Sequence, residues 1–277
     1  MSETKRGRIL MTGAAGGVGT FLRSGLAALG WQVRGFDLVV PDDPGRAEWL
    51  VGDVGDAAAL DAAMRDVDVV IHLAGIPVED RFERILKSNI DGTYQVFDAA
   101  LRAGVPRILT ASSNHAVGYY ERADFRDAPI GVDVRPRPDT YYGVSKVFME
   151  AIGSFYADRH GLQVACVRIG SCFAEPLNRR MLDTWLSPAD AVRLFDALAT
   201  APELGYEIVY GISANKTAWW DLEPARRLGY EPQDDSDAFA EKIAAAEDRA
   251  PDPQDPEYRY LGGRFTTQVP PRDQPRD

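Results

Sequence analysis

A tyrosine and a lysine in the middle of the chain have the spacing needed to remove a proton from a hydroxyl group. Tyr142 and Lys146 are four residues apart in an expected helix, so their side chains share one face. The pKa of a tyrosine is ordinarily about 10, and a nearby ammonium group favours the phenolate. Ser113 ends an earlier apolar stretch and could hold the reacting oxygen. We therefore predict that Tyr142 is a general base, with Lys146 and Ser113 as its catalytic partners.

The Tyr-x-x-x-Lys pattern alone is weak evidence, because it often occurs by chance as a surface pair on a helix. A glycine-rich segment near the N-terminus makes the combination more specific. It contains Gly13, Gly16 and Gly19, between an apolar stretch and a helical pattern. Glycines there let the backbone approach a pyrophosphate, whose charge is stabilised at the N-terminus of the helix. The two motifs together predict a nicotinamide-dependent enzyme that acts on a hydroxyl or carbonyl group.

An acidic residue at the end of the second expected strand, Asp37, favours NAD over NADP as the cofactor. Its carboxylate can accept hydrogen bonds from the adenosine ribose hydroxyls and would repel a 2′-phosphate. No arginine or lysine follows it before Arg46. In this part of the chain the expected cofactor contacts are Gly13, Gly16, Gly17, Val18, Gly19, Asp37 and Leu38.

Alternating strand and helix patterns predict an α/β fold, a doubly wound parallel sheet of the Rossmann type. The expected strands are 8–12, 32–37, 48–52, 67–73, 107–111, 163–169 and 207–210. The expected helices are 16–29, 79–103, 140–160 and one that begins after Ser187. We expect residues 1–170 to form the NAD-binding domain, including Tyr142 and Lys146. Residues 171–269 would form a small substrate-binding part that is no independent domain, and 270–277 a flexible tail.

The composition is that of a globular protein and argues against several classes of function. Hydrophobic residues make up 45% and charged residues 26% of the chain. The net charge of −11 at pH 7 argues against nucleic-acid binding. Two cysteines offer no disulfide framework, and three histidines without metal-ligand spacing predict no metal site. Without a signal peptide or an apolar run of roughly 18 residues, a cytoplasmic protein that binds no membrane is expected.

With these motifs in place, the chain resembles the extended short-chain dehydrogenase/reductase superfamily over nearly its whole length. Further marks of the resemblance are Asp53, His72-Leu-Ala-Gly75 and Asn89-x-x-Gly92-Thr93. The superfamily commonly assembles through its long helices, so a homo-oligomer is expected. The resemblance also implies NAD contacts by Asp53, Val54, Leu73, Ala74, Gly75, Ile76, Asn89, Lys146, Ile169 and Cys172. For Asn89, a polar role in helix packing is nearly as well supported.

Several segments resemble more closely the uronate dehydrogenase family, notably 111–120, 167–172, Arg180-Met181 and Trp219-Trp220-Asp221. This resemblance implies NAD-dependent oxidation of the anomeric carbon of a hexuronic acid, D-glucuronate or D-galacturonate, to an aldarolactone. The implied substrate contacts are Ser113, Asn114, His115, Tyr142, Ser171 and Arg180. Arg180 would grip the carboxylate, a task suited to a planar bidentate donor. Pro77 departs from the small hydroxyl residue of some members, which bears on affinity or epimer preference.

Two other functions remain open at this stage. A nucleotide-sugar epimerase or dehydratase of the same superfamily usually has a larger C-terminal part than residues 171–277. A dehydratase would also need an acidic pair near Ser113, where this chain has Asn114 and His115. An NAD-sensing regulator would keep the fold but typically lose Tyr142 or Lys146, and both are present.

Overall fold

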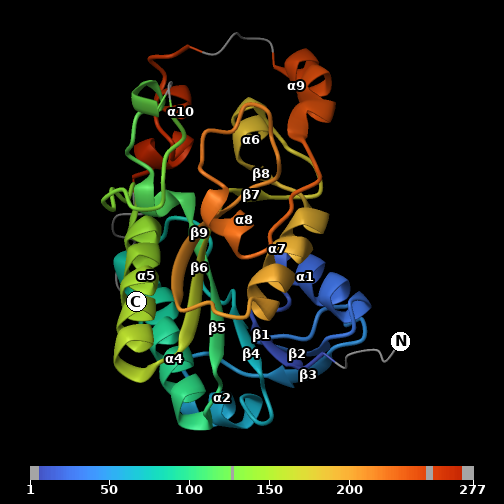
Figure 1. Ribbon diagram of the computed structural model, residues 1–277. Helices are drawn as coiled ribbons and strands as arrows, with labels where there is room; N and C mark the ends of the chain where they lie inside the picture. Colours follow the sequence, from blue (N-terminus) through green and yellow to red (C-terminus); the bar gives the residue numbers. More distant parts are fainter. Residues whose placement is uncertain (1–5, 126–127, 248–251, 270–277) are drawn as a thin grey trace.

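One central parallel sheet organises the computed structural model, which describes residues 6–125, 128–247 and 252–269 (Figure 1). Within these residues the sheet has seven strands in the order β3-β2-β1-β4-β5-β6-β9. They are β1 (Arg8–Thr12), β2 (Gln32–Asp37), β3 (Glu48–Val51), β4 (Val69–His72), β5 (Arg107–Ser113), β6 (Gln163–Ile169) and β9 (Tyr206–Gly211). A separate two-stranded sheet pairs β7 (Ser171–Cys172) with β8 (Trp185–Leu186).

Helices connect the strands and cover the sheet. The α-helices are α1 (Gly17–Ala28), α2 (Ala57–Ala63), α3 (Phe82–Ile85), α4 (Gly92–Ala103), α5 (Tyr141–His160), α6 (Arg179–Thr184), α7 (Pro188–Thr200), α8 (Glu223–Arg227), α9 (Ala240–Ala246) and α10 (Pro256–Arg259). A π-helix, η1 (Leu86–Asp91), joins α3 to α4. Short 3-10 helices are η2 (Asn114–Val117), η3 (Arg122–Phe125), η4 (Ser236–Phe239) and η5 (Gly263–Thr267).

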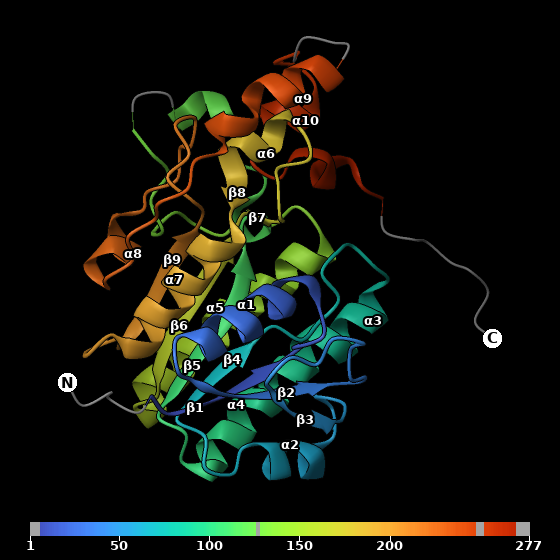
Figure 2. The same cartoon turned by 90° about the vertical axis from the view of Figure 1, so that its right-hand side faces the viewer.

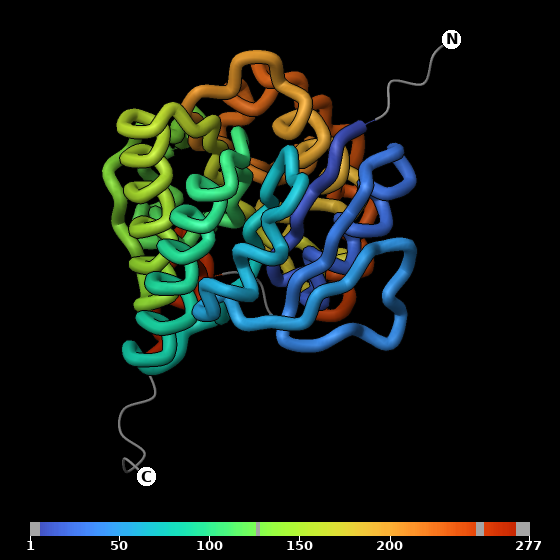
Figure 3. The backbone as a smooth tube through the Cα atoms, turned by 90° about the horizontal axis from the view of Figure 1, so that it is seen from below, coloured from blue at the N-terminus to red at the C-terminus, as the bar shows by residue number. Residues whose placement is uncertain are grey.

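Alternation along each strand divides the core into two layers, one on each face of the sheet. On β1, Ile9 and Met11 belong to the cluster that contains residues of α1 and α7. Leu10, between them, belongs to the cluster that contains residues of α2, α4 and α5. Figures 2 and 3 show the two helix layers with the sheet between them. The doubly wound α/β fold expected from the sequence is confirmed.

The strand order reverses between β1 and β4, which lie side by side and lead to opposite halves of the sheet. In such sheets, ligands bind in the crevice beyond the carboxyl ends of the strands at this reversal. Gly13 follows β1 there, and a Cβ on it would lie 2.6 Å from the backbone nitrogen of Ala74, just after β4. The fold therefore places the glycine segment at the expected nucleotide crevice.

The helix predicted over 79–103 is confirmed from Phe82 to Ala103, but it begins at Phe82 rather than Glu79 and its middle, η1, is a π-helix. Asn89 lies in this π-helical segment with its side chain buried. Its amide accepts a hydrogen bond from the Ile76 backbone N–H at 2.8 Å and donates one to the Ile76 carbonyl at 2.9 Å. The π-helical turn thus occurs where the Asn89 side chain is hydrogen-bonded to the loop after β4. Hydrophobic periodicity along the sequence does not predict such a contact.

Residues after Gly170 add to the sheet and also build the region above it. Strand β9 pairs in parallel with β6, and α7 packs on α1. Ser187 caps α7 by accepting a hydrogen bond from the Asp190 N–H at 2.9 Å, as its sequence predicts. Helices α6, α9 and α10 gather beyond the carboxyl ends of β5 and β6 (Figure 1). The division at Gly170 stays a prediction, and the predicted tail, 270–277, lies outside the described residues.

Candidate active site

Helix α5 positions Tyr142 through its N-terminal cap. The Thr140 hydroxyl accepts a hydrogen bond from the Gly143 N–H at 2.9 Å, which ends the preceding loop and starts the helix. The Tyr142 N–H donates to a Glu79 carboxylate oxygen at 3.0 Å. A carboxylate at this end of a helix also interacts favourably with the helix dipole. Tyr142, only 9% exposed, is therefore held in the first turn of α5.

Lys146 lies one turn further along the same face of α5. Its ammonium group donates to the carbonyl of Ala111 on β5 at 2.7 Å and lies 5.3 Å from the centroid of the Tyr142 ring. Burial lowers the pKa of Lys146 from 10.5 to about 8. The predicted pairing of Tyr142 with Lys146 is thus present in the structure, with the lysine tied to the strand that ends in Ser113.

The electrostatics of Tyr142 differ from the sequence expectation. Burial, with a smaller contribution from the charge of Asp139, raises the pKa of Tyr142 to about 12, whereas a hydrogen bond with Ser113 opposes the rise. The lowered pKa expected for Tyr142 is therefore not found in the protein alone, because burial disfavours the charged phenolate. Additional positive charge near the phenol oxygen would be needed to lower the pKa of Tyr142, so that the phenolate forms more readily near neutral pH.

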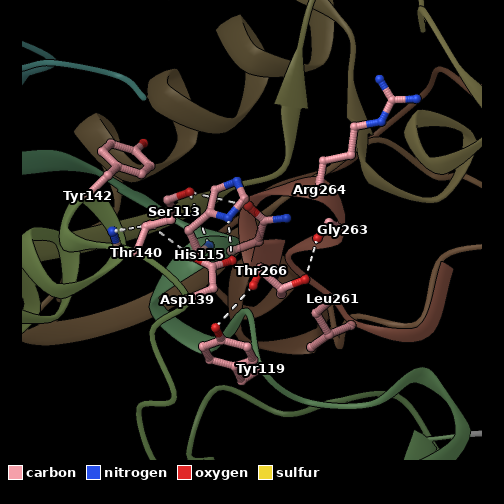
Figure 4. Close-up of polar contacts among 12 residues, drawn as sticks. Ser113, His115, Tyr119, Asp139, Thr140, Tyr142, Leu261, Gly263, Arg264 and Thr266 are labelled. Carbon is pink, nitrogen blue, oxygen red and sulfur yellow. Dashed lines mark hydrogen bonds and ion pairs between the residues drawn. The ribbon is translucent and has the colours of Figure 1, made fainter. Parts of the chain in front are cut away.

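The strand-end residues after β5 form the adjacent wall of the site. The Ser113 hydroxyl donates to the Asn114 side-chain oxygen at 3.2 Å, and the Asn114 side-chain nitrogen is buried with no hydrogen-bond partner. His115 pairs through Nδ1 with the Asp139 carboxylate at 2.7 Å. Its ring stacks on Phe265, with centroids 3.9 Å apart. Figure 4 shows Ser113, His115 and Asp139 beside Tyr142. Two predicted substrate contacts, Ser113 and His115, therefore lie beside Tyr142, and a third, Asn114, is bonded to Ser113.

The glycine segment has the geometry of a pyrophosphate cradle. Gly13 has a φ of +70°, in the left-handed region that favours glycine. Helix α1 begins without a side-chain cap, which leaves the N–H groups of its first turn available to an anion. The Asp37 carboxylate accepts a hydrogen bond from the Ala15 N–H at 2.9 Å, which places it against the same loop. These residues fit the phosphates and adenosine ribose of NAD.

The other predicted cofactor contacts lie along the same crevice, at the carboxyl ends of the strands. Leu38, 64% exposed, follows Asp37. Asp53 is exposed and accepts a hydrogen bond from the Gly55 N–H at 2.8 Å. Val54 is buried. The loop after β4 supplies Leu73, Ala74, Gly75 and Ile76, and β6 and β7 supply Ile169 and Cys172. Their roles toward NAD stay predictions.

Ser171 and His72 both have their polar atoms engaged within the protein. The Ser171 hydroxyl hydrogen-bonds to that of Thr184 at 2.8 Å. His72 bonds to the hydroxyls of Thr12 and Thr93, and burial lowers its pKa to about 3. His72 is therefore a neutral structural residue. Ser171 would have to exchange its bond to Thr184 in order to contact substrate.

Two consecutive arginines at the start of α6 have different surroundings. Arg179 pairs with Glu247, with 3.0 Å between Nε and Oε2. Arg180 donates from Nη2 to the Leu261 carbonyl at 2.6 Å, and its Nε is buried without a partner. Burial and the neighbouring Arg122 lower the pKa of Arg180 to about 10, although Asp139 opposes this. Arg180 is thus the arginine of the two that lacks a close counter-ion among the residues that the structure describes.

Three residues at the site were not predicted from the sequence: Glu79, Asp139 and Phe265. Asp139 precedes the Thr140 cap, and an acidic residue three positions before the predicted base Tyr142 is a signal that could have singled it out. Glu79 and Phe265 come from the β4–α3 loop and from η5, and their contacts span long stretches of chain. No local pattern reports such contacts.

The comparisons with known proteins agree with this site. The model of the NAD dependent epimerase/dehydratase family matches residues 9–210. A uronate dehydrogenase of Pseudomonas putida is 42% identical over 272 residues, which cover 98% of this chain and 99% of that protein. A uronate dehydrogenase structure from Agrobacterium tumefaciens, a tyrosine-to-alanine mutant complexed with NAD, has a TM-score of 0.89 at 43% identity, covering 95% of this chain and 98% of that one. Glucuronic acid dehydrogenase of Chromohalobacter salexigens has a TM-score of 0.90 at 41% identity, covering 97% and 99%.

The chain belongs to the NAD dependent epimerase/dehydratase family. Within that family it is similar to the curated uronate dehydrogenases, to which it is 41–44% identical over nearly the whole chain. The resemblance stated from the sequence is confirmed, and the NAD named by the family agrees with the predicted cofactor. In the described residues, no helix is both long and apolar enough to cross a membrane.

Replacement of Gly19 tests the cradle, because this glycine packs against the loop that it follows. A Cβ at Gly19 would lie 2.6 Å from the carbonyl oxygen of Gly13. Gly19→Ala is expected to lower the free energy of unfolding by about 1–3 kcal/mol and to weaken NAD binding at least about tenfold. Gly17→Ala is the matched control for stability, since its Cβ would meet no atom within 4 Å. Urea denaturation and NAD titration measure both effects, and equal stability of the two variants would contradict the packing argument.

The buried ammonium of Lys146 predicts a pH-dependent stability. Its pKa is about 8 in the fold and ordinarily 10.5, so between these values the unfolded chain binds the proton that the folded chain has lost. The contribution of Lys146 to stability therefore rises with pH over this window, by up to about 1.4 kcal/mol per pH unit. Urea denaturation at several pH values, compared with Lys146→Met, isolates this contribution. A difference between the two proteins that does not change with pH would contradict the lowered pKa.

Proposed function

We propose that the protein oxidises C1 of hexuronic acids such as D-glucuronate and D-galacturonate, with NAD as hydride acceptor, and releases an aldarolactone. The observation that carries the proposal is the guanidinium of Arg180, whose Nε is buried and which has no ion-pair partner among the residues that the structure describes. The segment that accepts its hydrogen bond, at Leu261, continues to Phe265, which stacks on His115 beside Tyr142. A carboxylate on Arg180 would thus belong to a sugar that reaches the proposed base.

The proposed reaction moves one proton and one hydride. Tyr142 takes the proton of the C1 hydroxyl, the C1–H bond breaks, and the two electrons of the oxygen form the lactone carbonyl. NAD, held by the glycine segment and Asp37, would supply the hydride acceptor and, in its oxidised form, a positive charge. Ser113 holds the reacting oxygen, and Lys146 keeps the face of α5 in register with β5. The positive charge is the feature that the protein alone lacks for lowering the pKa of Tyr142.

The strand-end residues can orient the sugar ring. The unpartnered Asn114 nitrogen is a donor for a ring hydroxyl. The carboxylate of Asp139 favours the proton on Nδ1 of His115, which leaves Nε2 as an acceptor in the neutral ring. One donor and one acceptor in fixed positions suit two hydroxyls of a sugar. Ser171 is the remaining proposed contact, by exchange of its bond to Thr184.

The alternative nucleotide-sugar epimerase or dehydratase has less support. Near Ser113 the structure places Asn114 and His115, and His115 is engaged with Asp139 rather than presenting an acidic pair. The uronate dehydrogenase relatives cover almost the whole chain, including the part after Gly170. The proposed homo-oligomer and the cytoplasmic location stay predictions, as does the assignment of residues 1–170 to NAD and 171–269 to substrate.

Purified protein is expected to reduce NAD with D-glucuronate and D-galacturonate, and to be nearly silent with D-glucose, UDP-glucose or NADP. Tyr142→Phe should lower turnover at least about a hundredfold through loss of the base, while NAD binding persists. Tyr141→Phe is the matched control, since Tyr141 is 41% exposed and packs edge-on against Phe82. NADH absorbance gives the rates. Near-normal turnover of Tyr142→Phe would exclude the proposed base, and silence with uronates would exclude the substrate class.

Replacement of Arg180 tests the carboxylate site. Arg180→Ala should raise the Michaelis constant for D-galacturonate at least about tenfold, because a charge-assisted hydrogen bond contributes roughly 1.5–3 kcal/mol. The same substitution should change the weak turnover of D-galactose, which has no carboxylate, far less. Arg179→Ala is the neighbouring control, since Arg179 has Glu247 as its partner. An equal effect of Arg180→Ala on both sugars would remove this residue from carboxylate binding.

A further inference from the structure

Arg122, in η3, has two buried donors without a hydrogen-bond partner among the residues that the structure describes. Its Nη1 pairs with Asp183 at 2.6 Å, whereas Nε and Nη2 are buried without a hydrogen-bond partner. These two atoms lie on one edge of the guanidinium and point in the same direction. A buried donor without a partner costs roughly 1–3 kcal/mol, and more when it is charged. The unused edge of Arg122 is therefore a site where an acceptor would be stabilising.

Arg168 shows within this chain what such an edge accepts. Its Nε and Nη2 donate to the two carboxylate oxygens of Glu150, at 2.8 and 2.9 Å. This bidentate arrangement suits any planar oxyanion and also phosphate. Arg122 presents the same pair of atoms with no carboxylate opposite them. Burial lowers the pKa of Arg122, although Asp183, Tyr258 and Glu257 oppose this.

The surroundings of Arg122 have room for a ligand that also reaches Arg180. Arg122 lines two neighbouring cavities of about 570 and 380 Å³, both of which also include Thr217 and Tyr258 in their walls. The smaller cavity is lined by Arg180 as well. Trp219 supports the guanidinium of Arg122 from one side, 4.5 Å from the ring centroid. One molecule with two anionic groups can therefore engage both arginines.

We propose that Arg122 is the receptor for a second oxyanion, and that the substrates include a uronic acid disaccharide. This inference rests on the proposed function. With C1 of the reducing ring at Tyr142 and its carboxylate at Arg180, position 4 of that ring lies on the side opposite C1, next to the carbon that bears the carboxylate. A second uronate linked there extends past Arg180. Its carboxylate would occupy the unused edge of Arg122, with a shift of the side chains that now enclose Nε and Nη2.

Calorimetric titration of the protein saturated with NADH tests the receptor without turnover. The probes are D-galacturonate, 1,4-linked digalacturonate and inorganic phosphate. The wild type is expected to bind the disaccharide at least about tenfold more tightly than the monosaccharide. Arg122→Gln should abolish this advantage. Arg122→Lys should lose most of it although it keeps the charge beside Asp183, because an ammonium has no two-pronged edge. Arg102→Gln, which removes a paired arginine on α4, is the matched control and should keep the advantage.

Each outcome decides the inference. No advantage of the disaccharide in the wild type, together with no phosphate binding, would overturn the receptor. An advantage that persists in Arg122→Gln would overturn the role of Arg122. Phosphate binding that Arg122→Gln abolishes, without a disaccharide advantage, would keep the receptor and overturn the disaccharide. Oxidation of D-galacturonate by the wild type is scored separately, so the proposed function can hold when the second site fails. Thermal unfolding of Arg122→Lys checks that the variant folds.

Discussion

The ion pair between Glu150 and Arg168 joins the helix that carries Tyr142 to the strand beside it. Both side chains are almost fully buried, and the Ser112 hydroxyl adds a third bond to the carboxylate at 2.6 Å. Charges at this depth are tolerated only when they are paired and hydrogen-bonded, so α5 is confined to a position in which all these bonds form. Lys146 lies one turn before Glu150 on α5, so the same constraint holds it where its ammonium group donates to the carbonyl of Ala111. The placement of the proposed base thus depends on a contact that takes no part in the chemistry.

Some buried polar side chains have all their hydrogen bonds within the protein, and others do not. His72 has a partner for each ring nitrogen, and Asn89 bonds to both backbone groups of Ile76. In contrast, Asn114 and Arg180, which we propose to contact the sugar, keep buried donors without hydrogen-bond partners among the described residues. An unpaired buried donor is costly in the protein alone, and a ligand that pairs with it removes the cost. Such atoms favour sugars whose hydroxyls and carboxylate fall at those positions.

Much of this structure could be predicted from the sequence, and the failures have physical causes. The strands β1, β2 and β6 have the predicted bounds, and the inner residues of β1 and β6 are mostly apolar, as is typical of buried parallel strands. The glycine segment and the Tyr-x-x-x-Lys pair can also be predicted, because the geometry of each is determined by a few neighbouring residues. The π turn around Asn89, and the approach of Phe265 to His115, arise from contacts between distant parts of the chain. The raised pKa of Tyr142 also depends on burial in three dimensions, which spacing does not reveal.

The last described segment of the chain completes the proposed sugar site. The N–H groups of Leu261 and Gly262 donate to the carbonyls of Tyr120 and Gly118, and this contact brings Phe265 onto His115. Strand β9, the final strand of the sheet, ends at Gly211, well before that segment. A ribosome makes the chain from its N-terminus, so the parallel sheet and its nucleotide crevice can form before the sugar pocket exists. During biosynthesis, the ability to hold a dinucleotide would therefore arise earlier than the ability to hold a sugar.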